Sequence, residues 1–530
     1  MKRLFIVTTF LLLQAGIHNS QAALNMTVRG DTIINTLSEY FFGHNYWMWC
    51  PSWGNQIEGT EAQVSDLKLD LLRFGGISVD LGYPDAVSNS VLQDYADYCK
   101  TVNAEPLLQL QLAKYTNTED RVSNAAAMFT YFKSISPVKF VSIGNEPDIY
   151  PDNLGVNASY GAEYLQSYTL DDYCNDFNAV ATEIKRLDPN VKIVGLELSH
   201  KYNEWIPEFV SRCKDNVDII SLHYYPNAAS GCSYNTARGQ DIYMRSFYLN
   251  ARVLINQNAG DKVIPLIIGE TNITWDGDPA HSTYSASPGT FNAALWFAEF
   301  VGISSAQKNL LSIMPWSLRE GWTLGFLDES SKPKPVFHVY KMFTNNAKKH
   351  LIHRQSLNSY VKVLGYKDDS GNVSIFTMNW DTTSSYELTM NFSGLFSDSS
   401  FSCTVPPQSF SCFNFPANSP EPEITVYSKG MSLPTSVIFT PGSQKSAPKL
   451  IQTTFNRKAS SIEIFSQNPI QNVGAAVFNL QGRIIYETKI GTLKKGLTTL
   501  QLKKSLISSG VHILRIYSNS QVITEYKLNK

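Results

Sequence analysis

The sequence is poor in charge and has no excess of either sign. Charged residues make up 17% of the 530 residues, and 44 basic residues nearly balance 46 acidic ones, which gives a net charge of −2 at pH 7. Proteins that bind nucleic acid or an anionic membrane surface need a basic field, which this balance does not supply. We therefore expect no nucleic-acid partner.

Cysteine is also scarce. None of the seven cysteines stands in a CxxC pair or beside a histidine cluster with metal-site spacing. We therefore expect no metal and no cofactor, and no cysteine has an evident histidine partner for thiol catalysis. The odd number leaves at least one cysteine unpaired within a monomer, and Cys403 and Cys412 are the candidate disulfide pair of an exported protein.

Long apolar runs are missing except for one at the N-terminus, which is short. A basic start at 1–3 precedes an apolar core at 4–13, and small residues follow at Ser20 and Ala22. The core is shorter than the roughly 18 residues that a membrane helix needs. This pattern predicts a signal peptide over residues 1–22, cleaved after Ala22. We expect a secreted or cell-surface protein with no membrane insertion.

Two short apolar stretches share one pattern, in which a run rich in Val and Ile ends in glycine and glutamate. Residues 138–143 lead into Gly144-Asn145-Glu146-Pro147, and residues 263–268 lead into Gly269-Glu270. Such runs are typical of buried parallel strands, and Pro147 ends ladder pairing. Each glutamate therefore lies at the carboxyl end of a strand, where α/β barrels place their chemistry.

The spacing of these two glutamates fits a barrel and suggests a reaction. Glu146 and Glu270 are 124 residues apart, about three βα units of roughly 40 residues each. Glycoside hydrolysis needs such a pair, because one carboxylic acid protonates the leaving oxygen and a second carboxylate attacks or activates water. Aromatic residues reach 12%, which suits sugar binding and a large core equally well.

The two motifs resemble the acid/base and nucleophile signatures of the clan of retaining (β/α)₈ glycosidases, where they close strands four and seven. Within that clan, the sequence is most similar to the heparanase and β-glucuronidase family. The resemblance covers roughly residues 36–345 and a small flanking β-domain. Its motifs are Leu72-Arg73-Phe74-Gly75-Gly76 with Asp80, Gly144-Asn145-Glu146-Pro147, His223-Tyr224-Tyr225 and Gly269-Glu270-Thr271.

The resemblance implies catalytic roles, with Glu146 as the general acid/base and Glu270 as the nucleophile. It also implies that Arg73 keeps Glu270 ionised, although a purely structural ion pair is the alternative. Asn145 would bind the sugar 2-hydroxyl, and Tyr225 would donate a hydrogen bond to the nucleophile.

Two further substrate-binding candidates have competing interpretations. His223 leaves strand six in a His-x-Tyr pattern, but a hydrogen-bonded core histidine would look the same. Trp316 ends strand eight and would form an aromatic floor under the reacting sugar. Trp322 competes for that role, because Pro315 could end the strand one residue early.

Apolar runs alternate with helical stretches across residues 36–345, which predicts one (β/α)₈ TIM barrel. One such helix is predicted at 172–187, before Asp188-Pro189. The eight predicted strands lie at 41–47, 71–76, 106–111, 138–145, 191–197, 217–222, 263–269 and 310–316.

The flanks of the barrel change to period-two patterning, which indicates β-structure. Residues 24–35 and 346–416 together predict a β-sandwich packed on the barrel, with a hairpin turn at Asp368-Asp369-Ser370-Gly371. Residues 417–449 are rich in Pro, Ser and Thr and are predicted to be a linker.

Residues 450–530 alternate again and predict a C-terminal all-β domain. Asn479-x-x-Gly482-Arg483, Ser509-Gly510-Val511-x-Ile513-Leu514 and a terminal Lys527-Leu528-Asn529-Lys530 resemble the sorting domain of the type IX secretion system. The resemblance implies that system's machinery as a partner. An accessory carbohydrate-binding domain is the alternative.

The sequence thus predicts a secreted retaining β-glycosidase acting on a polysaccharide or oligosaccharide. The alternatives are a catalytically silent sugar-binding barrel and a β-glucuronidase or heparanase-like enzyme. The predicted strand-seven loop at 271–279 has one glycine and two aspartates. Because glycine-rich backbone favours anion nests and aspartate repels a uronate, this loop favours a neutral sugar.

Overall fold

A computed structural model describes residues 23–437, with short gaps at 47–48, 51–53, 56–58, 83–86, 154–156, 159–160 and 321, and the strands between 451 and 528. The predicted signal peptide at 1–22 lies outside the described residues. Among those described, no helix has the length and apolarity that crossing a membrane would require.

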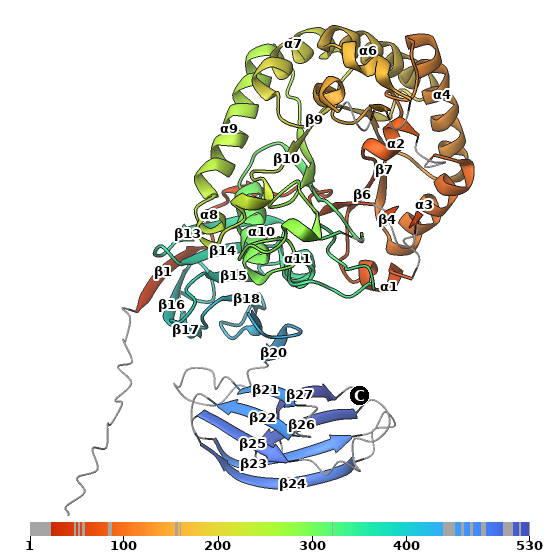
Figure 1. Ribbon diagram of the computed structural model, residues 1–530. Coiled ribbons are helices and arrows are strands. Elements are labelled where there is room, and N and C mark those ends of the chain that lie inside the picture. The colour runs from red at the N-terminus through yellow and green to blue at the C-terminus, as the bar shows by residue number, and fades with distance from the viewer. Residues whose placement is uncertain are drawn as a thin grey trace, which may run out of the picture.

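Eight parallel strands form one sheet whose order follows the sequence (Figure 1). A parallel bridge between Phe42 and Ile313 joins the last strand to the start of the first, so the sheet closes into the predicted TIM barrel. Its strands are β3 (Gly43–Asn45), β6 (Leu71–Phe74), β7 (Glu105–Leu110), β8 (Phe140–Ile143), β9 (Lys192–Leu198), β10 (Ile219–Tyr224), β11 (Leu266–Thr271) and β12 (Leu310–Pro315).

Helices surround this sheet (Figure 1). The predicted helix at 172–187 begins two residues earlier, because Thr169 and Asp172 form a capping box. The larger helices are α3 (Asn89–Val102), α4 (Thr118–Ile135), α6 (Leu170–Leu187), α7 (Tyr202–Cys213), α9 (Asp241–Asn258), α10 (Phe291–Ser304) and α11 (Pro335–Asn346). The shorter ones are α1 (Glu61–Ser65), α2 (Ile77–Leu81), α8 (Tyr234–Arg238), η1 (Pro147–Asp152), η2 (Glu163–Ser167), η3 (Ala229–Gly231) and η4 (Pro279–His281).

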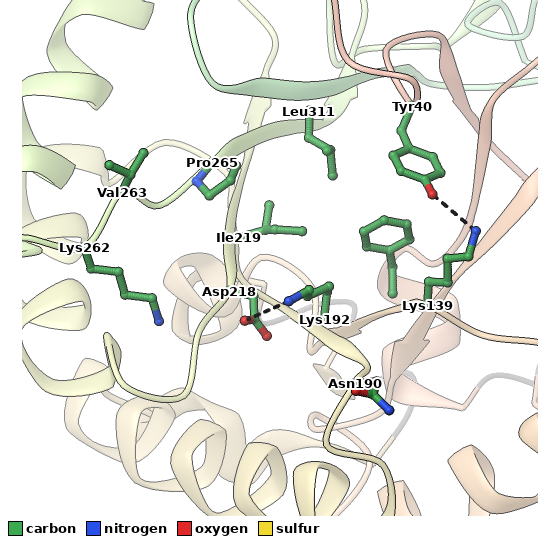
Figure 2. Close-up of a pocket in the computed structure, with 11 residues that line it drawn as sticks. Tyr40, Lys139, Asn190, Lys192, Asp218, Ile219, Lys262, Val263, Pro265 and Leu311 are labelled. Atoms are coloured by element: carbon green, nitrogen blue, oxygen red, sulfur yellow. Dashed lines mark hydrogen bonds and ion pairs between the residues drawn. The ribbon is translucent and has the colours of Figure 1, made fainter.

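A pocket of about 470 Å³ opens at the amino-terminal end of the barrel strands, opposite the glutamates (Figure 2). Its three lysines already have partners. Lys139 pairs with Glu105 at 2.8 Å, Lys192 lies 3.9 Å from Asp218, and Lys262 donates to backbone carbonyls. Because these cations are engaged, the pocket is a structural feature of this end of the barrel.

Two further sheets form the predicted β-sandwich beside the barrel, with an apolar core between them. β1 pairs with β16, and β2 pairs with β13, so the segment before the barrel completes both sheets as expected. One sheet contains β2 (Asn35–Thr36), β13 (His350–Ser356), β14 (Val361–Lys367), β15 (Val373–Asn379), β18 (Ser409–Phe415), β19 (Glu423–Ser428) and β20 (Thr435–Val437); the other contains β1 (Leu24–Arg29), β16 (Tyr386–Ser393) and β17 (Ser400–Val405).

The structure corrects the predicted linker at 417–449. Strand β19 lies inside that range and pairs along its length with β18, and β20 pairs with β19. Ile424 and Val426 alternate into the sandwich core, and Tyr427 packs toward the barrel helices. The surrounding Pro, Ser and Thr residues concealed this short alternating strand.

The predicted Cys403–Cys412 disulfide is wrong. Both residues are buried free thiols. Cys403 lies on β17 in the core between the two sheets, whereas Cys412 lies on β18 in the core shared with the barrel. Because β17 and β18 belong to different sheets, the hairpin that would have joined the two cysteines does not form.

The C-terminal strands form two antiparallel sheets with a core of their own, as predicted for an all-β unit. Most of the sorting-domain motif residues, at 479–483, 509–511 and 529–530, lie outside the described residues. The strands are β21 (Ile451–Asn456), β22 (Ser461–Ser466), β23 (Ile470–Phe478), β24 (Ile484–Leu493), β25 (Gly496–Gln501), β26 (His512–Ser518) and β27 (Gln521–Leu528).

Candidate active site

Glu146 and Glu270 meet at the carboxyl end of the barrel strands. Gly144 and Glu146 both have positive φ (76° and 51°), so the chain turns sharply after β8 and presents the Glu146 side chain. Glu270 lies in the last residues of β11. One oxygen of each carboxylate and a ring nitrogen of His223 lie within 4.8 Å of one another. The structure thus brings together the two predicted catalytic residues.

Arg73 organises the polar groups around Glu270. Its Nη1 donates to Glu270 Oε1 at 2.9 Å and to Asn45 Oδ1 at 2.8 Å. Its Nη2 donates to Asn145 Oδ1 at 2.8 Å and to Gln109 Oε1 at 3.1 Å. The guanidinium is fully buried, and these fixed acceptors hold its planar fork in one orientation.

Tyr225 and His223 bring further donors to the two glutamates. The Tyr225 hydroxyl donates to Glu270 Oε2 at 2.8 Å, so both oxygens of Glu270 are engaged. The Nδ1 atom of His223 lies 2.8 Å from Glu146 Oε1 and 3.6 Å from Glu270 Oε2. His223 is therefore part of the carboxylate site and more than a hydrogen-bonded core histidine.

The carboxylates around His223 make it a cation at neutral pH. Burial alone would lower the pKa of His223, but Glu270, Glu146 and Glu197 raise it to about 10. Its Nε2 lies 3.0 Å from Glu197 Oε2, so each ring nitrogen faces a carboxylate oxygen. A protonated ring donates hydrogen bonds in both directions.

Burial and the two neighbouring cations act on the pKa of Glu270 in opposite directions. Burial raises the pKa of Glu270 above its ordinary value, and His223 and Arg73 oppose this without cancelling it. Arg73 favours the ionised form of Glu270, and the expectation that it keeps this carboxyl ionised stays a prediction. Because Glu146 and Glu270 are close, their protons belong to the pair and not to either residue alone.

Asp80 fixes the segment that carries Asn145 and Glu146. Its carboxylate accepts hydrogen bonds from the Asn145 amide at 2.9 Å and from the Leu112 amide at 2.7 Å, and also from the Tyr150 hydroxyl. Asp80 is fully buried, and burial raises its pKa despite these donors.

Trp316 is the tryptophan that lies across the mouth of the barrel. An ideal Cβ on Gly76 would lie only 2.8 Å from its ring, so the ring lies against the backbone after β6. The peptide bond from Trp316 to Ser317 is cis. Trp322, the competing candidate, is 49% exposed on the following loop.

The loops after β11 and β12 are joined at the rim of this mouth. The Thr323 amide donates to Gly277 O at 2.9 Å, and Asn272 Nδ2 donates to Leu324 O at 3.0 Å. Trp275, on the first of these loops, is 62% exposed. Two exposed indole rings therefore belong to neighbouring loops at the rim.

The sequence analysis did not identify three polar residues of the site. Asn45 and Gln109 bind Arg73, and Glu197 lies 3.4 Å from Arg73 Nε. Glu197 ends an apolar strand in the run Gly195-Leu196-Glu197, the same kind of pattern that singled out Glu146 and Glu270. That pattern was a usable signal for this residue.

Glu146, His223 and Glu270 are also the ligand types of a metal site, and their spacing would admit an ion. Metal binding requires a neutral imidazole. Both ring nitrogens of His223 instead face carboxylate oxygens, Nδ1 at 2.8 Å from Glu146 and Nε2 at 3.0 Å from Glu197, as a protonated ring does. The chemistry of this group fits proton transfer better than metal binding.

Comparisons with models of known protein families and with curated proteins each give no match. Solved structures do match. An α-L-arabinofuranosidase from Thermotoga maritima superposes with a TM-score of 0.55 at 13% identity, covering 75% of this chain and 98% of that one.

Two further matches have similar statistics. CelM2, a bifunctional glucanase-xylanase from a metagenome library, gives a TM-score of 0.56 at 13% identity and covers 74% of this chain and 99% of its own. A glycoside hydrolase family 44 xyloglucanase from Paenibacillus polymyxa gives 0.52 at 11% identity and covers 73% and 98%. At these identities, the likeness establishes the barrel fold and its flanking sheet region.

Proposed function

We propose that this chain is a secreted retaining β-glycosidase that hydrolyses a neutral β-linked glycan. The observation that carries the proposal is the approach of Glu146 and Glu270 oxygens to within 4.8 Å at the carboxyl ends of the barrel strands. Retaining glycosidases place their two carboxyl groups about 5–5.5 Å apart, whereas inverting ones leave about 6.5–9.5 Å for a water. Carboxylate oxygens within 4.8 Å of each other favour the shorter of these two group separations, and so favour retention.

The first chemical step uses both glutamates. A carboxylate oxygen of Glu270 attacks the anomeric carbon while Glu146 gives its proton to the leaving oxygen, so the glycosidic bond breaks and a glycosyl–enzyme ester forms. Arg73 and Tyr225 contact different oxygens of Glu270 and orient it for the attack.

The second step reverses these roles. Glu146, now a carboxylate, takes a proton from a water that attacks the same carbon, and the ester bond to Glu270 breaks. The His223 cation lies 2.8 Å from Glu146, so it stabilises the charge that Glu146 acquires between the two steps.

Asn145 contributes to substrate binding. Its side-chain nitrogen is the group it can offer to the sugar, because its side-chain oxygen already accepts a hydrogen bond from Arg73.

The loop after β11 supports a neutral sugar. Its Ile273, Asp276 and Asp278 amides each bond to a side chain of the same loop, so they do not form a nest for a uronate carboxylate. Asp276 also lies 2.8 Å from His281 Nδ1, which reduces the repulsion expected from its charge. The names of the matching structures refer to arabinose, glucan, xylan and xyloglucan, which are neutral.

The exposed Trp275 and Trp322 support a substrate longer than one sugar. An indole ring packs well on the apolar face of a pyranose. The two rings lie on the loops that follow β11 and β12, and a backbone hydrogen bond from Thr323 to Gly277 joins these loops.

A panel of nitrophenyl β-glycosides, a nitrophenyl α-L-arabinofuranoside and polymeric glycans tests this function. We expect turnover of a neutral glycoside and of a polymer, abolished in Glu270→Ala. A strong preference for the glucuronide would contradict the loop argument and support the heparanase-like alternative. Binding of glycans without turnover of any substrate would support the silent sugar-binding barrel.

A further inference from the structure

A third glutamate, this one fully buried, lies beneath Glu146 and Glu270. This residue is Glu197, on β9. Its Oε2 lies 3.0 Å from His223 Nε2 and accepts a hydrogen bond from Ser221 Oγ at 2.7 Å. Its Oε1 lies 3.4 Å from Arg73 Nε. Glu197 thus contacts both cations of the site, from the side away from the other two glutamates.

The backbone of β9 is distorted at this residue. Leu196 and Glu197 both have positive φ (77° and 47°), a conformation that costs free energy for residues with a Cβ. Ser221 of β10 pairs with Leu196 and Leu222 pairs with Leu198, so Glu197 is the extra residue of a β-bulge. Such bulges redirect a side chain and are frequent beside active sites.

Two hydrogen bonds hold the bulge in place. The Leu196 amide donates to the Tyr173 hydroxyl at 3.0 Å, and the Glu146 amide donates to Glu197 O at 2.9 Å. The second bond joins the backbone of Glu197 directly to the proposed acid/base. A change in this bulge would therefore move Glu146.

The neighbouring strand leaves room for the Glu197 carboxylate. An ideal Cβ on Gly269 would lie 2.6 Å from Glu197 Oε2 and 2.3 Å from Ser221 Oγ, which is too close for any side chain. The Ser221 hydroxyl and the Glu197 carboxylate together fill the space beside Gly269, so a glycine fits there.

Arg73, His223, Glu146, Glu197 and Glu270 form one charged cluster. Its total charge depends on Glu197. Burial would raise the pKa of Glu197, but Arg73 and then His223 lower it to about 2, so it is a carboxylate. Arg73 and His223 are positive and Glu197 is negative. The cluster is therefore neutral when Glu146 and Glu270 share a single proton and carry one negative charge between them, and burial favours the neutral state. A retaining glycosidase needs that state, with one carboxylic acid and one carboxylate.

We propose that Glu197 is a positioning residue that fixes Arg73 and His223 and, through its charge, retains one proton on the Glu146–Glu270 pair. This inference rests on the proposed function of the same site. The titratable and polar groups around Glu197 and its two cations come from nearly every strand of the barrel. They are Asn45 from β3, Arg73 from β6, Gln109 from β7, Asn145 and Glu146 after β8, Tyr173 from α6, Tyr202 from α7, Ser221, His223 and Tyr225 from β10 and its end, and Glu270 from β11.

The variant Glu197→Gln tests the charge, because glutamine keeps the shape and can still bond to Ser221 and His223. Without the carboxylate, the cluster with one shared proton becomes positive, so that proton leaves more readily. It leaves from the carboxyl pair and not from His223, since a carboxylic acid is ordinarily a stronger acid than an imidazolium. We expect kcat/KM at pH 7 to fall at least tenfold and the alkaline limb of its pH profile to move down by about one pH unit or more.

Two further variants separate charge from structure. Glu197→Asp keeps the charge on a shorter side chain, so the limb should return toward the wild-type pH even if kcat stays low. Glu299→Gln removes another buried, ion-paired glutamate, which binds Lys362 away from the site. Glu299→Gln should lower the stability of the protein and leave the alkaline limb of the kcat/KM profile at the wild-type pH. An alkaline limb of Glu197→Gln that coincides with the wild type would overturn the proposal.

A second measurement does not depend on turnover. In protein with ¹⁵N-labelled histidine, NMR reports the protonation of each ring nitrogen. We expect His223 to be doubly protonated at pH 8 in the wild type and to titrate at least one pH unit lower in Glu197→Gln. An unchanged His223 titration would overturn the proposal. If the wild type hydrolyses no glycoside while His223 shifts as expected, the proposed function fails and the charge arrangement stands.

Discussion

At the scale of single residues, the site is a set of buried charges that compensate one another. Arg73, His223 and Glu197 have no exposed side-chain area, and Glu270 has little. Isolated charges at such positions would be very unfavourable, and removing one partner leaves another uncompensated. Substitutions here will therefore change both activity and stability, which makes pH dependence a better diagnostic than activity alone.

The shifted pKa of His223 predicts how stability depends on pH. Its pKa rises from 6.5 to about 10 on folding, so its contribution is complete below about pH 6.5 and is lost as the pH rises through 10. The difference in unfolding free energy between wild type and His223→Gln should therefore shrink from pH 6.5 to pH 10. Urea unfolding at several pH values measures this difference.

Comparison of the two proteins at each pH removes the contributions of other groups, such as Lys334, whose pKa burial lowers to about 8. A difference between wild type and His223→Gln that is constant over this range would show that His223 is not charged through its carboxylate partners.

The sequence revealed the two glutamates and missed residues that act through other side chains of the site. Glu146 and Glu270 stand out because each follows an apolar run and a glycine. Gln109 gives no such signal, since its role depends on Arg73, which is 36 residues away. Glu197 had the signal, but its bulge, which needs two left-handed residues, is not readable from the sequence.

At the scale of elements, all eight barrel strands lie within the predicted ranges or extend past them by a few residues. Apolar runs and the alternation with helices are local signals, and closure of the sheet follows from them.

Pairing between β17 and β18 was not predictable in the same way. Successive strands can join one sheet or cross to another, and the Cys403–Cys412 prediction failed for this reason.

The corrected position of β19 makes a prediction about truncated chains. A chain that ends at residue 416 loses the buried Ile424, Val426 and Tyr427. Burial of each of these three side chains contributes about 1.5–3 kcal/mol, so this chain should be destabilised by at least about 4.5 kcal/mol. A chain that ends at residue 437 retains β19, so its barrel and sandwich should unfold at the same temperature as those of the full chain.

Thermal unfolding of the two truncated chains, followed by circular dichroism, compares them directly. Equal transition temperatures for the chains that end at 416 and 437 would mean that β19 is not part of the sandwich and that the predicted linker boundary was right.

At the scale of the whole molecule, the barrel and its companion sheets share a core that the C-terminal strands do not. Phe343 of α11 stacks on Phe376 of β15 with ring centroids 4.5 Å apart, inside the large core cluster. The C-terminal sheets have a separate cluster that includes Ile464, Val473 and Ile516. Because the C-terminal sheets have this separate core, we propose that they act as the predicted type IX sorting unit, apart from the barrel.

The export proposal predicts different fates for two chains in a bacterium that has a type IX secretion system. The full chain should reach the cell surface or the medium, with a mature N-terminus at Ala23. A chain that lacks residues 450–530 should stay in the periplasm with the same N-terminus. Equal release of both chains would assign the C-terminal strands another role, such as carbohydrate binding.

The stereochemistry of azide products tests the assignment of the two glutamates most directly. In Glu270→Ala, azide should take the place of the nucleophile and give a glycosyl azide of inverted configuration. In Glu146→Ala, a glycosyl–enzyme still forms from an activated substrate, and azide should then give the retained configuration. Proton NMR of the anomeric signal distinguishes the two products. Opposite anomers from the two variants are the predicted result, and the same anomer from both, or no azide product from either, would contradict the account.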